Sequence, residues 1–402
     1  MGDSKAPSDD RLSPYFADLH VHIGRSQDGQ PVKISGSRNL TFRQIAKEAS
    51  ERKGIELVGI IDCHSPAVQK DILDCLHSGE MEEVPGGGIR YRNTTLLLGA
   101  EMEVKEEGGG PFHLLGFLPS LQAMREWTAW MTPRVANIRL STQRIRVTAR
   151  ELQAELVARG GLLIPAHIFT PHRGLLGCSA DRLADRLDPD GIAAVELGLS
   201  ADSDMAGTLS ELDRYAFLTN SDAHSPGMIG RECNELLLST PSFEEFAKAL
   251  KGEQGRRILA NYGLHPELGK YHETSCAACR RTVPETEEEV AVCPYCGSSR
   301  LTRGVSGRIR RLADRERPLQ PEGRPPYRPQ VPLSFFPGVG PAKREKLLTE
   351  VGTEMDILHR FPAEAIASAA GEKIAELIVR AREDKLSFTS GSGGSYGSIR
   401  QS

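Results

Sequence analysis

Two histidines stand one residue apart near the N-terminus, in the stretch FADLHVH that spans residues 16–22. Alternate residues of a strand point to one face, so His20 and His22 present both imidazoles on the same side. Two aligned imidazoles at a strand end suit a metal ion, but they also suit a hydrogen-bonded pair at a barrel mouth. This fragment by itself leaves both interpretations open.

Other residues of metal-ligand type stand near the ends of further predicted strands. They are Asp62 and His64, Glu101, His113, His167, Glu196, and Asp222 and His224. In parallel α/β folds the functional site lies at the carboxyl ends of the strands, so we expect these side chains to converge on one mouth. Each residue alone is more often structural, but their repetition over consecutive strands predicts a metal site.

The elements that must position these residues are apolar runs that alternate with helical patterns up to about residue 260. The strand-like runs are LVGIIDCHS, TLLLGAEMEV, PFHLLGFL, GLLIPAHIF, IAAVELGLS and AFLTNSDAH. Thr41 with Gln44, and Ser242 with Glu245, have the spacing of capping boxes that begin helices. Alternating strands and helices predict an α/β fold with a mainly parallel sheet, either open or closed into a barrel.

Four of the eight cysteines form two close pairs, Cys276-x-x-Cys279 and Cys293-x-x-Cys296. This spacing is close to that of a zinc ribbon and predicts one structural zinc. It leaves open whether the surface of that element touches DNA, and a redox role for the thiols is a weaker alternative. The other cysteines are scattered and are read as small buried apolar residues.

The segment FFPGVGPAKREKLL places Gly338 and Gly340 ahead of a helix whose first turn holds Lys343 and Arg344. Such glycines let the backbone approach a phosphate at the positive helix end, as DNA-binding helix-hairpin-helix motifs do. AAGEKIAELI supplies a second turn of this kind. The alternative is a helical pair that packs only for stability.

Two basic stretches favour a nucleic-acid partner, although the net charge of the 402-residue chain is −4. Residues 134–150 contain five arginines and no acid, and Arg139, Arg144 and Arg146 are candidate phosphate contacts. Residues 308–330 are rich in arginine and proline, and this proline density argues against a packed element. An exposed, solvated helix face is the ordinary explanation of such runs.

The remaining composition bears on location. No apolar run approaches the length of a membrane helix, and the polar, acidic N-terminus is unlike a secretory signal, so we expect a cytoplasmic protein without a membrane partner. The glycine- and serine-rich residues 387–402 predict a flexible tail.

The chain resembles the polymerase-and-histidinol-phosphatase (PHP) domain in its order of motifs. They are HxH on the first strand, DxH on the second, a glutamate, two lone histidines and a late DxH. The whole layout, including GIIDCHSP, ELGLSADSD and TNSDAHSP, is similar to the endonuclease Q family. The resemblance implies a PHP-type distorted (β/α)7 barrel with a small four-cysteine zinc domain and a C-terminal helical, helix-hairpin-helix-like domain. We expect a catalytic domain over 14–265, a zinc domain over 266–306, a connector over 307–330, a DNA-binding domain over 331–386 and a tail over 387–402.

The resemblance also implies metal ligands. It places His20, His22, Glu101 and Asp222 on one metal, which Glu101 bridges to a second metal held by His113 and His167, while His64 and His224 bind a third. The family often supplies another histidine after HxH, but GRSQDGQ has none, so Asp28 or Asp62 would substitute. Glu103 competes with Glu101, and Glu196 is either a ligand or an orienting group. Asp222, His224, Glu101 and Glu196 are the expected catalytic residues, with up to three Zn, Mn or Mg ions.

The family resemblance further implies a metal-dependent DNA repair endonuclease that acts on damaged duplex or single-stranded DNA. It would recognise hypoxanthine, uracil, xanthine and abasic sites and cut 5′ of the lesion, with the base flipped out of the stack. Candidate base-pocket residues lie around His172 and Arg173, and around Ser200. The alternatives are a PHP phosphatase or exonuclease without lesion specificity and a non-catalytic DNA-binding scaffold. The sequence does not decide whether a sliding clamp also binds.

Overall fold

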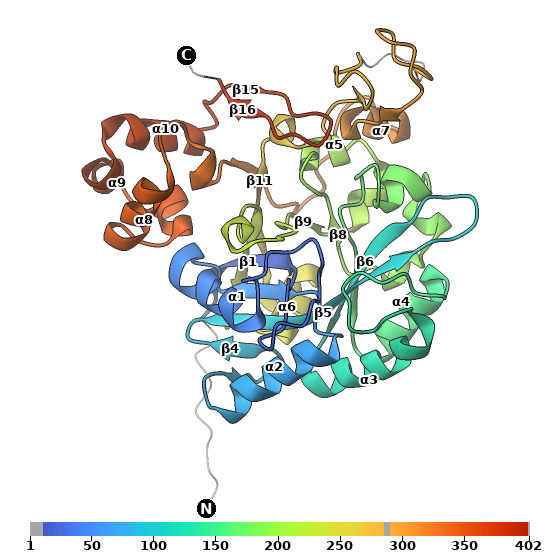
Figure 1. The fold of residues 1–402 in the computed structure, drawn as a ribbon, viewed down its shortest axis with the longest axis vertical. Helices are drawn as coiled ribbons and strands as arrows, with labels where there is room; N and C mark the ends of the chain where they lie inside the picture. Colours follow the sequence, from blue (N-terminus) through green and yellow to red (C-terminus); the bar gives the residue numbers. More distant parts are fainter. Residues whose placement is uncertain (1–10, 285–289, 401–402) are drawn as a thin grey trace, which may run out of the picture.

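The computed structural model describes residues 11–284 and 290–400, and within them seven strands close into a distorted barrel (Figure 1). They are β1 (Ser13–Val21), β2 (Leu57–Ile60), β5 (Thr94–Val104), β6 (Phe112–Leu118), β7 (Leu162–Pro165), β8 (Val195–Glu196) and β9 (Phe217–Leu218). Regular ladders join β1, β2, β5, β6 and β7 in that order, and β8 pairs with β9. Backbone hydrogen bonds complete the ring, from Ala193 N to Leu163 O at 2.9 Å and from His22 N to Ala223 O at 3.1 Å. The predicted α/β barrel is confirmed.

Strand β6 runs antiparallel to both of its neighbours, β5 and β7, whereas β1, β2 and β5 are parallel. His113 is the second residue of β6 and does not follow its end, so the expectation that His113 closes a strand is wrong. Because β6 is reversed, its beginning lies at the same mouth as the ends of the parallel strands. The reversal therefore brings His113 to the predicted site.

Further strands extend the sheet beyond the barrel. β10 (Cys233–Leu238) pairs antiparallel with β1, β11 (Arg257–Leu264) with β10, and β14 (Tyr327–Gln330) lies parallel to β11. On the other edge, β4 (Ile89–Tyr91) pairs with β5 and β3 (Glu82–Glu83) with β4. The apolar runs do not predict β10 and β11, which contain the buried residues Asn234 and Asn261. These side chains bond each other at 2.9 Å and hold the backbone at Thr219 and Phe217, so they attach the short β9 to the larger sheet.

The barrel interior is apolar below the mouth. Helix α6 (Phe243–Lys251) closes the opposite end, where Phe243 and Phe246 pack with interior residues that include Leu19, Leu97 and Phe117. Burying this apolar surface is the main stabilising contribution. The polar residues of the interior are thereby confined to one end.

Helices cover the outside of the barrel. They are α1 (Phe42–Glu48), α2 (Pro66–His77), α3 (Leu121–Met131) and α4 (Ala149–Ala158), and the short α5 (Ser203–Ala206) follows β8 in the chain. The predicted helix starts at Thr41 and Ser242 are confirmed, because their hydroxyls accept from Gln44 N at 3.3 Å and Glu245 N at 3.2 Å. These caps fix where α1 and α6 begin.

The cysteine element contains the short antiparallel pair β12 (Ser275–Cys276) and β13 (Leu301–Thr302) and leads into α7 (Val305–Leu312). Because α7 and β14 occupy both ends of residues 308–330, the expectation of no packed element there is wrong at these ends. Arg324 lies between them with its guanidinium carbon 3.5 Å from the Phe217 ring centre. The connector thus packs against the barrel through its arginine side chains.

The C-terminal helices are α8 (Pro341–Glu350), α9 (Ala363–Ala370) and α10 (Glu372–Arg382), which form a separate lobe beside α1 (Figure 1). Arg52 and Lys53, just after α1, pair with Glu345 at 2.7 Å and Glu354 at 2.5 Å. The Lys53–Glu354 pair is buried, so the lobe is attached to the barrel at this position.

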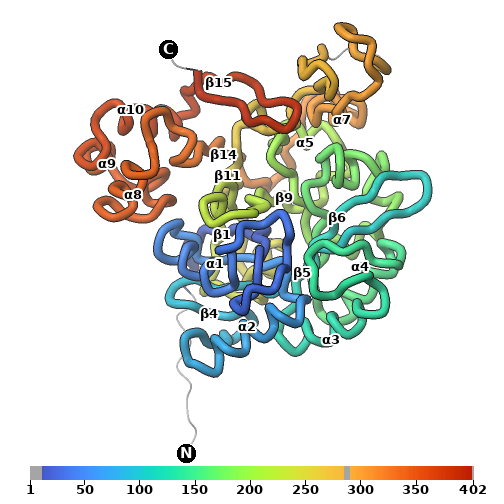
Figure 2. Tube along the Cα trace, viewed as in Figure 1, coloured from blue at the N-terminus to red at the C-terminus, as the bar shows by residue number. Residues whose placement is uncertain are grey.

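The prediction of a flexible tail is wrong for the described residues up to 400. β15 (Phe388–Thr389) and β16 (Ser398–Ile399) form a hairpin that runs between the C-terminal helices and the cysteine element (Figure 2). Gly391 N donates to Glu267 O at 2.6 Å and Gly397 N donates to Leu268 O at 3.0 Å. A Cβ at Gly391 would lie 2.4 Å from Gly269 O. Glycine here permits close backbone packing, which composition alone reads as flexibility.

Among the described residues, no helix is long and apolar enough to cross a membrane. The N-terminal stretch over residues 1–10, residues 285–289 of the predicted zinc domain and the last two residues of the predicted tail lie outside the described residues. The predicted domain boundaries stay predictions.

Candidate active site at the barrel mouth

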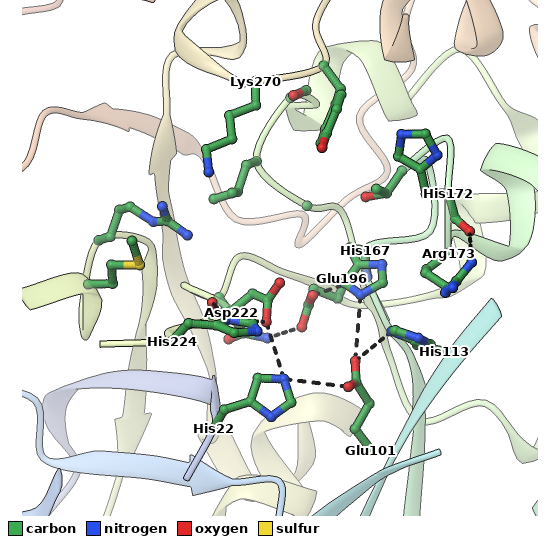
Figure 3. A pocket seen from close by; sticks show the side chains of 18 of the residues that line it. His22, Glu101, His113, His167, His172, Arg173, Glu196, Asp222, His224 and Lys270 are labelled. Carbon is green, nitrogen blue, oxygen red and sulfur yellow. Dashed lines mark hydrogen bonds and ion pairs between the residues drawn. The ribbon is translucent and has the colours of Figure 1, made fainter. Parts of the chain in front are cut away.

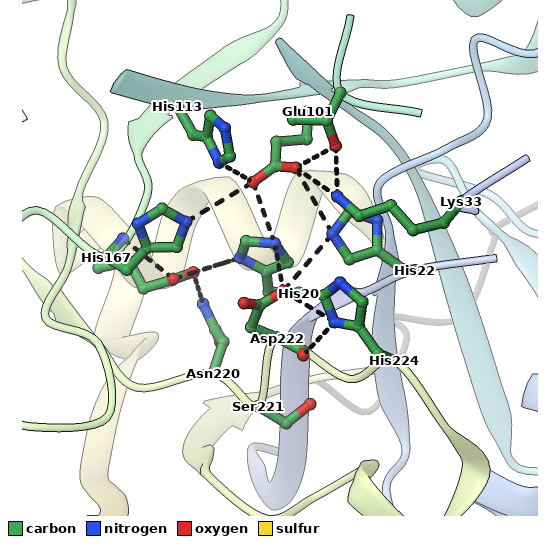
Figure 4. A network of polar contacts seen from close by, with 12 residues as sticks. His20, His22, Lys33, Glu101, His113, His167, Asn220, Ser221, Asp222 and His224 are labelled. Carbon is green, nitrogen blue, oxygen red and sulfur yellow. Dashed lines mark hydrogen bonds and ion pairs between the residues drawn. The ribbon is translucent and has the colours of Figure 1, made fainter. Parts of the chain in front are cut away.

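Three groups of metal-ligand side chains meet at the barrel mouth among the described residues (Figure 4). Within each group the ligand atoms lie within 4.8 Å of one another. The groups are His20, His22 and Glu101; Glu101, His113 and His167; and His22, Asp222 and His224. Glu101 and His22 each belong to two groups, so the three groups form one continuous cluster.

Two ring nitrogens at the centre of this cluster point at carboxylates without reaching them. His20 Nε2 lies 3.5 Å from Glu101 Oε1 and 3.4 Å from Asp222 Oδ1. His22 Nε2 lies 3.5 Å from Glu101 Oε2 and 3.4 Å from the same Asp222 oxygen. Both nitrogens are buried and make no hydrogen bond. Buried polar atoms are nearly always paired. These atoms therefore fit a divalent cation held between the imidazoles and carboxylates.

The second nitrogen of each of these rings is occupied by a buried carboxylate. Glu196 Oε2 lies 3.0 Å from His20 Nδ1, and Asp62 Oδ2 lies 3.0 Å from His22 Nδ1. Asp62 also accepts from Ile23 N at 2.7 Å. Burial opposes ionisation, but His22 lowers the pKa of Asp62 to about 2. A carboxylate behind an imidazole fixes the tautomer that leaves Nε2 free for a metal.

Two residues of the cluster have strained backbones. His167 has φ of 30° and Asp222 has φ of 46°, both in the left-handed region that non-glycine residues rarely adopt. Such strain persists only where surrounding contacts enforce it, and it concentrates at functional sites. Here it directs both side chains into the mouth.

A lysine that sequence reasoning missed lies beside the central glutamate. Lys33 Nζ is 3.4 Å from Glu101 Oε2 and 2.6 Å from Thr142 Oγ1, and Thr142 also bonds Glu101. Burial opposes ionisation of Glu101, but His113 and Lys33 hold its pKa well below the usual range. Lys33 lies eleven residues beyond HxH in a loop, and no spacing rule in the sequence marks it.

The four paired cysteines also come together. Cys276 Sγ and Cys296 Sγ are 3.6 Å apart, as are Cys279 Sγ and Cys293 Sγ. Four thiolates at about 2.3 Å from a tetrahedral zinc would be about 3.8 Å apart, so the cluster has the dimensions of a zinc site.

The chain is similar to known proteins in sequence and in fold. A family model described as PHP-associated matches residues 203–254. The chain is 51% identical over 391 residues to YqxK, an uncharacterised protein of Bacillus subtilis, and the match covers 97% of this chain and 100% of that protein. Among solved structures, the lesion-specific endonuclease PfuEndoQ from Pyrococcus furiosus is 34% identical with a TM-score of 0.84, over 96% of this chain and 95% of that one.

A second crystal structure, of endonuclease Q in complex with a 27-mer duplex substrate with an abasic lesion at the active site, is 33% identical. Its TM-score is 0.85, and the match covers 97% of both chains. The chain belongs to the endonuclease Q family. Membership of the endonuclease Q family makes it a metal-dependent endonuclease of the PHP type, and the predicted resemblance is confirmed.

Not every predicted ligand joins the cluster of this endonuclease Q family member. His64 Nε2 lies 3.2 Å from the Leu140 carbonyl, and His64 belongs to none of the three groups. Asp28 pairs with Lys70 at 3.4 Å, and Asp62 stands behind His22. The structure therefore brings neither Asp28 nor Asp62 into the place of the missing histidine.

Glu103 also stands outside the three groups. Its carboxylate pairs with Arg144 at 2.6 Å and Arg173 at 2.9 Å, and lies 3.8 Å from His113 Nε2. The His113 ring and the two guanidiniums lower the pKa of Glu103 to about 2. Glu103 thus holds two predicted DNA-contacting arginines near the metal-ligand cluster, whereas Glu101 occupies its centre.

A pocket of about 410 Å³ opens above the cluster (Figure 3). Its lining includes the predicted base-pocket residues His172, Arg173 and Ser200, together with Lys270 and Tyr396. This volume is typical of a small-molecule site. Lys270 and Tyr396 were not predicted, because they come from the segment after β11 and from the tail.

The other predicted DNA-contacting residues lie away from this pocket. Arg139 and Arg146 are exposed on the segment before α4. Gly338, with φ of 86°, precedes α8, and Gly340 is its N-cap residue. Lys343 and Arg344 follow in the first turn, as predicted, and both are half-buried.

Proposed function

We propose that the protein is a DNA repair endonuclease that recognises deaminated bases (hypoxanthine, uracil and xanthine) and abasic sites and hydrolyses the phosphodiester 5′ of the lesion. One observation carries this proposal. The metal-ligand cluster opens into a nucleotide-sized pocket in a chain that is similar, over nearly its whole length, to a lesion-specific endonuclease.

In this proposal, His20, His22, Glu101 and Asp222 would hold one divalent ion, and Glu101, His113 and His167 would hold a second. Asp222 and His224, with His22, offer a third position in place of the predicted pair of His64 and His224. Zn, Mn and Mg are the candidate ions, and imidazole-rich ligand sets favour the first two over Mg. When bound, such ions lower the pKa of water and polarise a phosphoryl group.

The protein's own residues orient this chemistry. Glu196 and Asp62 fix the His20 and His22 rings, so the ligand nitrogens face the mouth. Arg173 lines the pocket beside His113, where its guanidinium can orient a phosphate. No side-chain nucleophile is required, because water attacks the phosphorus atom and the 3′ oxygen leaves.

Lesion recognition in this proposal depends on a base that leaves the stack. A damaged or mispaired base costs less to unstack than a paired one, which favours its capture by the pocket. The exposed arginines before α4 and the glycine turn before α8 would hold DNA phosphates without reading sequence. The four cysteines would bind one structural zinc.

The test incubates the protein with Mn or Mg and end-labelled duplexes that carry one hypoxanthine, uracil or abasic site, beside an undamaged duplex. Asp222→Ala removes a central ligand, and Asp190→Ala, at an exposed carboxylate paired with Arg214, is the matched control. A single nick immediately 5′ of the lesion, lost only in Asp222→Ala, is the expected result.

Other outcomes identify the alternatives. Degradation of every duplex from its ends would mean an exonuclease, and turnover of phosphate monoesters without DNA cleavage would mean a phosphatase. Salt-sensitive DNA binding without hydrolysis under either metal would mean a scaffold.

A further inference from the structure

Two cations line the pocket that opens above the metal-ligand cluster. Arg231 and Lys270 both line the pocket that also contains Glu101 and Asp222, and Figure 3 shows Lys270 above Asp222. Neither forms an ion pair with a carboxylate within residues 11–284 and 290–400, and neither has a role in the function proposed above. Arg231 is only 6% exposed, and its Nε atom has no hydrogen-bond partner. A buried guanidinium without a counter-charge is costly unless an anion binds it.

Tyr396 contacts both cations, Arg231 through its hydroxyl and Lys270 through its ring. Arg231 Nη1 donates to the Tyr396 hydroxyl, and Lys270 Nζ lies 4.5 Å from the ring centre. The ring centre of Phe335 lies 5.5 Å from that of Tyr396. The C-terminal hairpin fixes Tyr396 in this place, since Gly394 N donates to Lys270 O at 3.1 Å. The C-terminal hairpin therefore contributes Tyr396 to the wall of the pocket.

The same network reaches the metal-ligand cluster. Arg231 Nη2 donates to the Ser221 carbonyl at 2.5 Å, and Ser221 immediately precedes the strained residue Asp222. The hairpin is thus linked to the strand end that supplies a metal ligand. A charged group bound by Arg231 and Lys270 would be held at a fixed place relative to the scissile bond.

We propose that Lys270 and Arg231, held by Tyr396, form a subsite for one backbone phosphate of the substrate strand. This phosphate is adjacent to the phosphate at which the strand is cut. The proposal rests on the function proposed above. It identifies the ligand as a phosphodiester of bound DNA, because the cations share one pocket with the metal-ligand cluster and a strand entering that pocket carries a charge at every nucleotide. Tyr396 is a positioning residue and the two cations are binding residues.

The first test measures DNA affinity by fluorescence anisotropy, without added divalent metal, over a series of salt concentrations. Lys270→Met is compared with Lys251→Met, at an exposed lysine on α6 at the closed end of the barrel. We expect Lys270→Met to weaken binding severalfold and to reduce the salt slope by about 1, whereas Lys251→Met changes neither. Equal slopes for the two variants would overturn the proposal.

The second test identifies the phosphate. Duplexes that carry a single uncharged methylphosphonate at successive positions around the lesion are bound by the wild type and by Lys270→Met. We expect one position to weaken wild-type binding and to have no further effect in the variant, because both changes remove the same contact. Additive effects at every position would mean that the cations do not hold a DNA phosphate.

Tyrosine variants test the positioning role. Tyr396→Phe removes only the hydroxyl that binds Arg231, and Tyr396→Ala also removes the ring beside Lys270. We expect the loss of DNA affinity to be larger in Tyr396→Ala than in Tyr396→Phe, and the thermal unfolding midpoints of both variants to equal that of the wild type. If both variants bind DNA as tightly as the wild type, the positioning role of Tyr396 is refuted. The readout is separate from nicking: a wild type that binds with this coupling but does not nick would contradict the proposed function and leave the subsite standing.

Discussion

Glu196 offers the sharpest test of how the metal-ligand cluster is organised. Its carboxylate is buried and accepts from His20 Nδ1 at 3.0 Å, from Asn220 Nδ2 at 2.8 Å and from His167 N at 3.1 Å. All these partners donate, so an ionised carboxylate satisfies them and a carboxamide does not. In Glu196→Gln one amide N–H faces a donor and the His20 ring loses its charged partner.

The size of the effect follows from these contacts. A hydrogen bond to a charged group contributes about 1.5–3 kcal/mol, which corresponds to about 10- to 150-fold in an equilibrium constant. Loss of a carboxylate behind a ligating histidine typically lowers metal affinity by about 10- to 100-fold. We therefore expect Glu196→Gln to require about 10- to 100-fold more metal for half-maximal nicking, with a turnover near that of the wild type at saturation.

The assay titrates Mn against single-turnover nicking of a lesion duplex, with metal affinity measured in parallel by calorimetry. Glu245→Gln is the control, because Glu245 is also buried but binds Arg256 at 2.9 Å at the closed end of the barrel. An unchanged metal requirement in Glu196→Gln would refute the orienting role. A turnover that stays low at saturating metal would instead show that Glu196 contacts a metal or the substrate directly.

Three further predictions concern stability, zinc and DNA. Burial raises the pKa of Glu232 to about 8 from an ordinary 4.5, so the folded chain keeps a proton that the unfolded chain releases above about pH 4.5. Wild-type stability should thus fall relative to Glu232→Gln by about 1.4 kcal/mol per unit between pH 5 and 8, measured by denaturant unfolding, and a pH-independent difference would contradict this. Cys293→Ser should lose one zinc per chain relative to the wild type by elemental analysis; a zinc content equal to that of the wild type would exclude the four-cysteine site. Arg173→Ala should reduce the salt slope of DNA binding by about 1, and an unchanged slope would remove Arg173 from the phosphate contacts.

Much of the site follows from short-range rules. Alternation along β1 puts His20 and His22 on one face, and the cysteine spacing brings four thiols together. Thr41 and Ser242 begin helices because a hydroxyl satisfies a free N–H within three residues. These features depend on neighbours in the chain, so the sequence by itself determined them.

Sequence spacing could not separate Glu101 from Glu103. Residues two apart on a strand share a face, so alternation gives both carboxylates the same direction. Only the position of β5 in the closed barrel decides that Glu101 reaches the centre while Glu103 meets Arg144 and Arg173. Similarly, only the reversed direction of β6 explains how His113, at the start of a strand, joins residues that follow strand ends.

The sequence by itself therefore determined the residue types of the site, the spacing of its histidines and cysteines, and the family pattern that they form. The tertiary structure alone decided which carboxylates stand behind the histidine rings, and it brought Lys33 and Tyr396 into the pocket. The physical reason is distance along the chain. Tyr396 meets Arg231 across 165 residues, and such a contact depends on the packing of the whole chain.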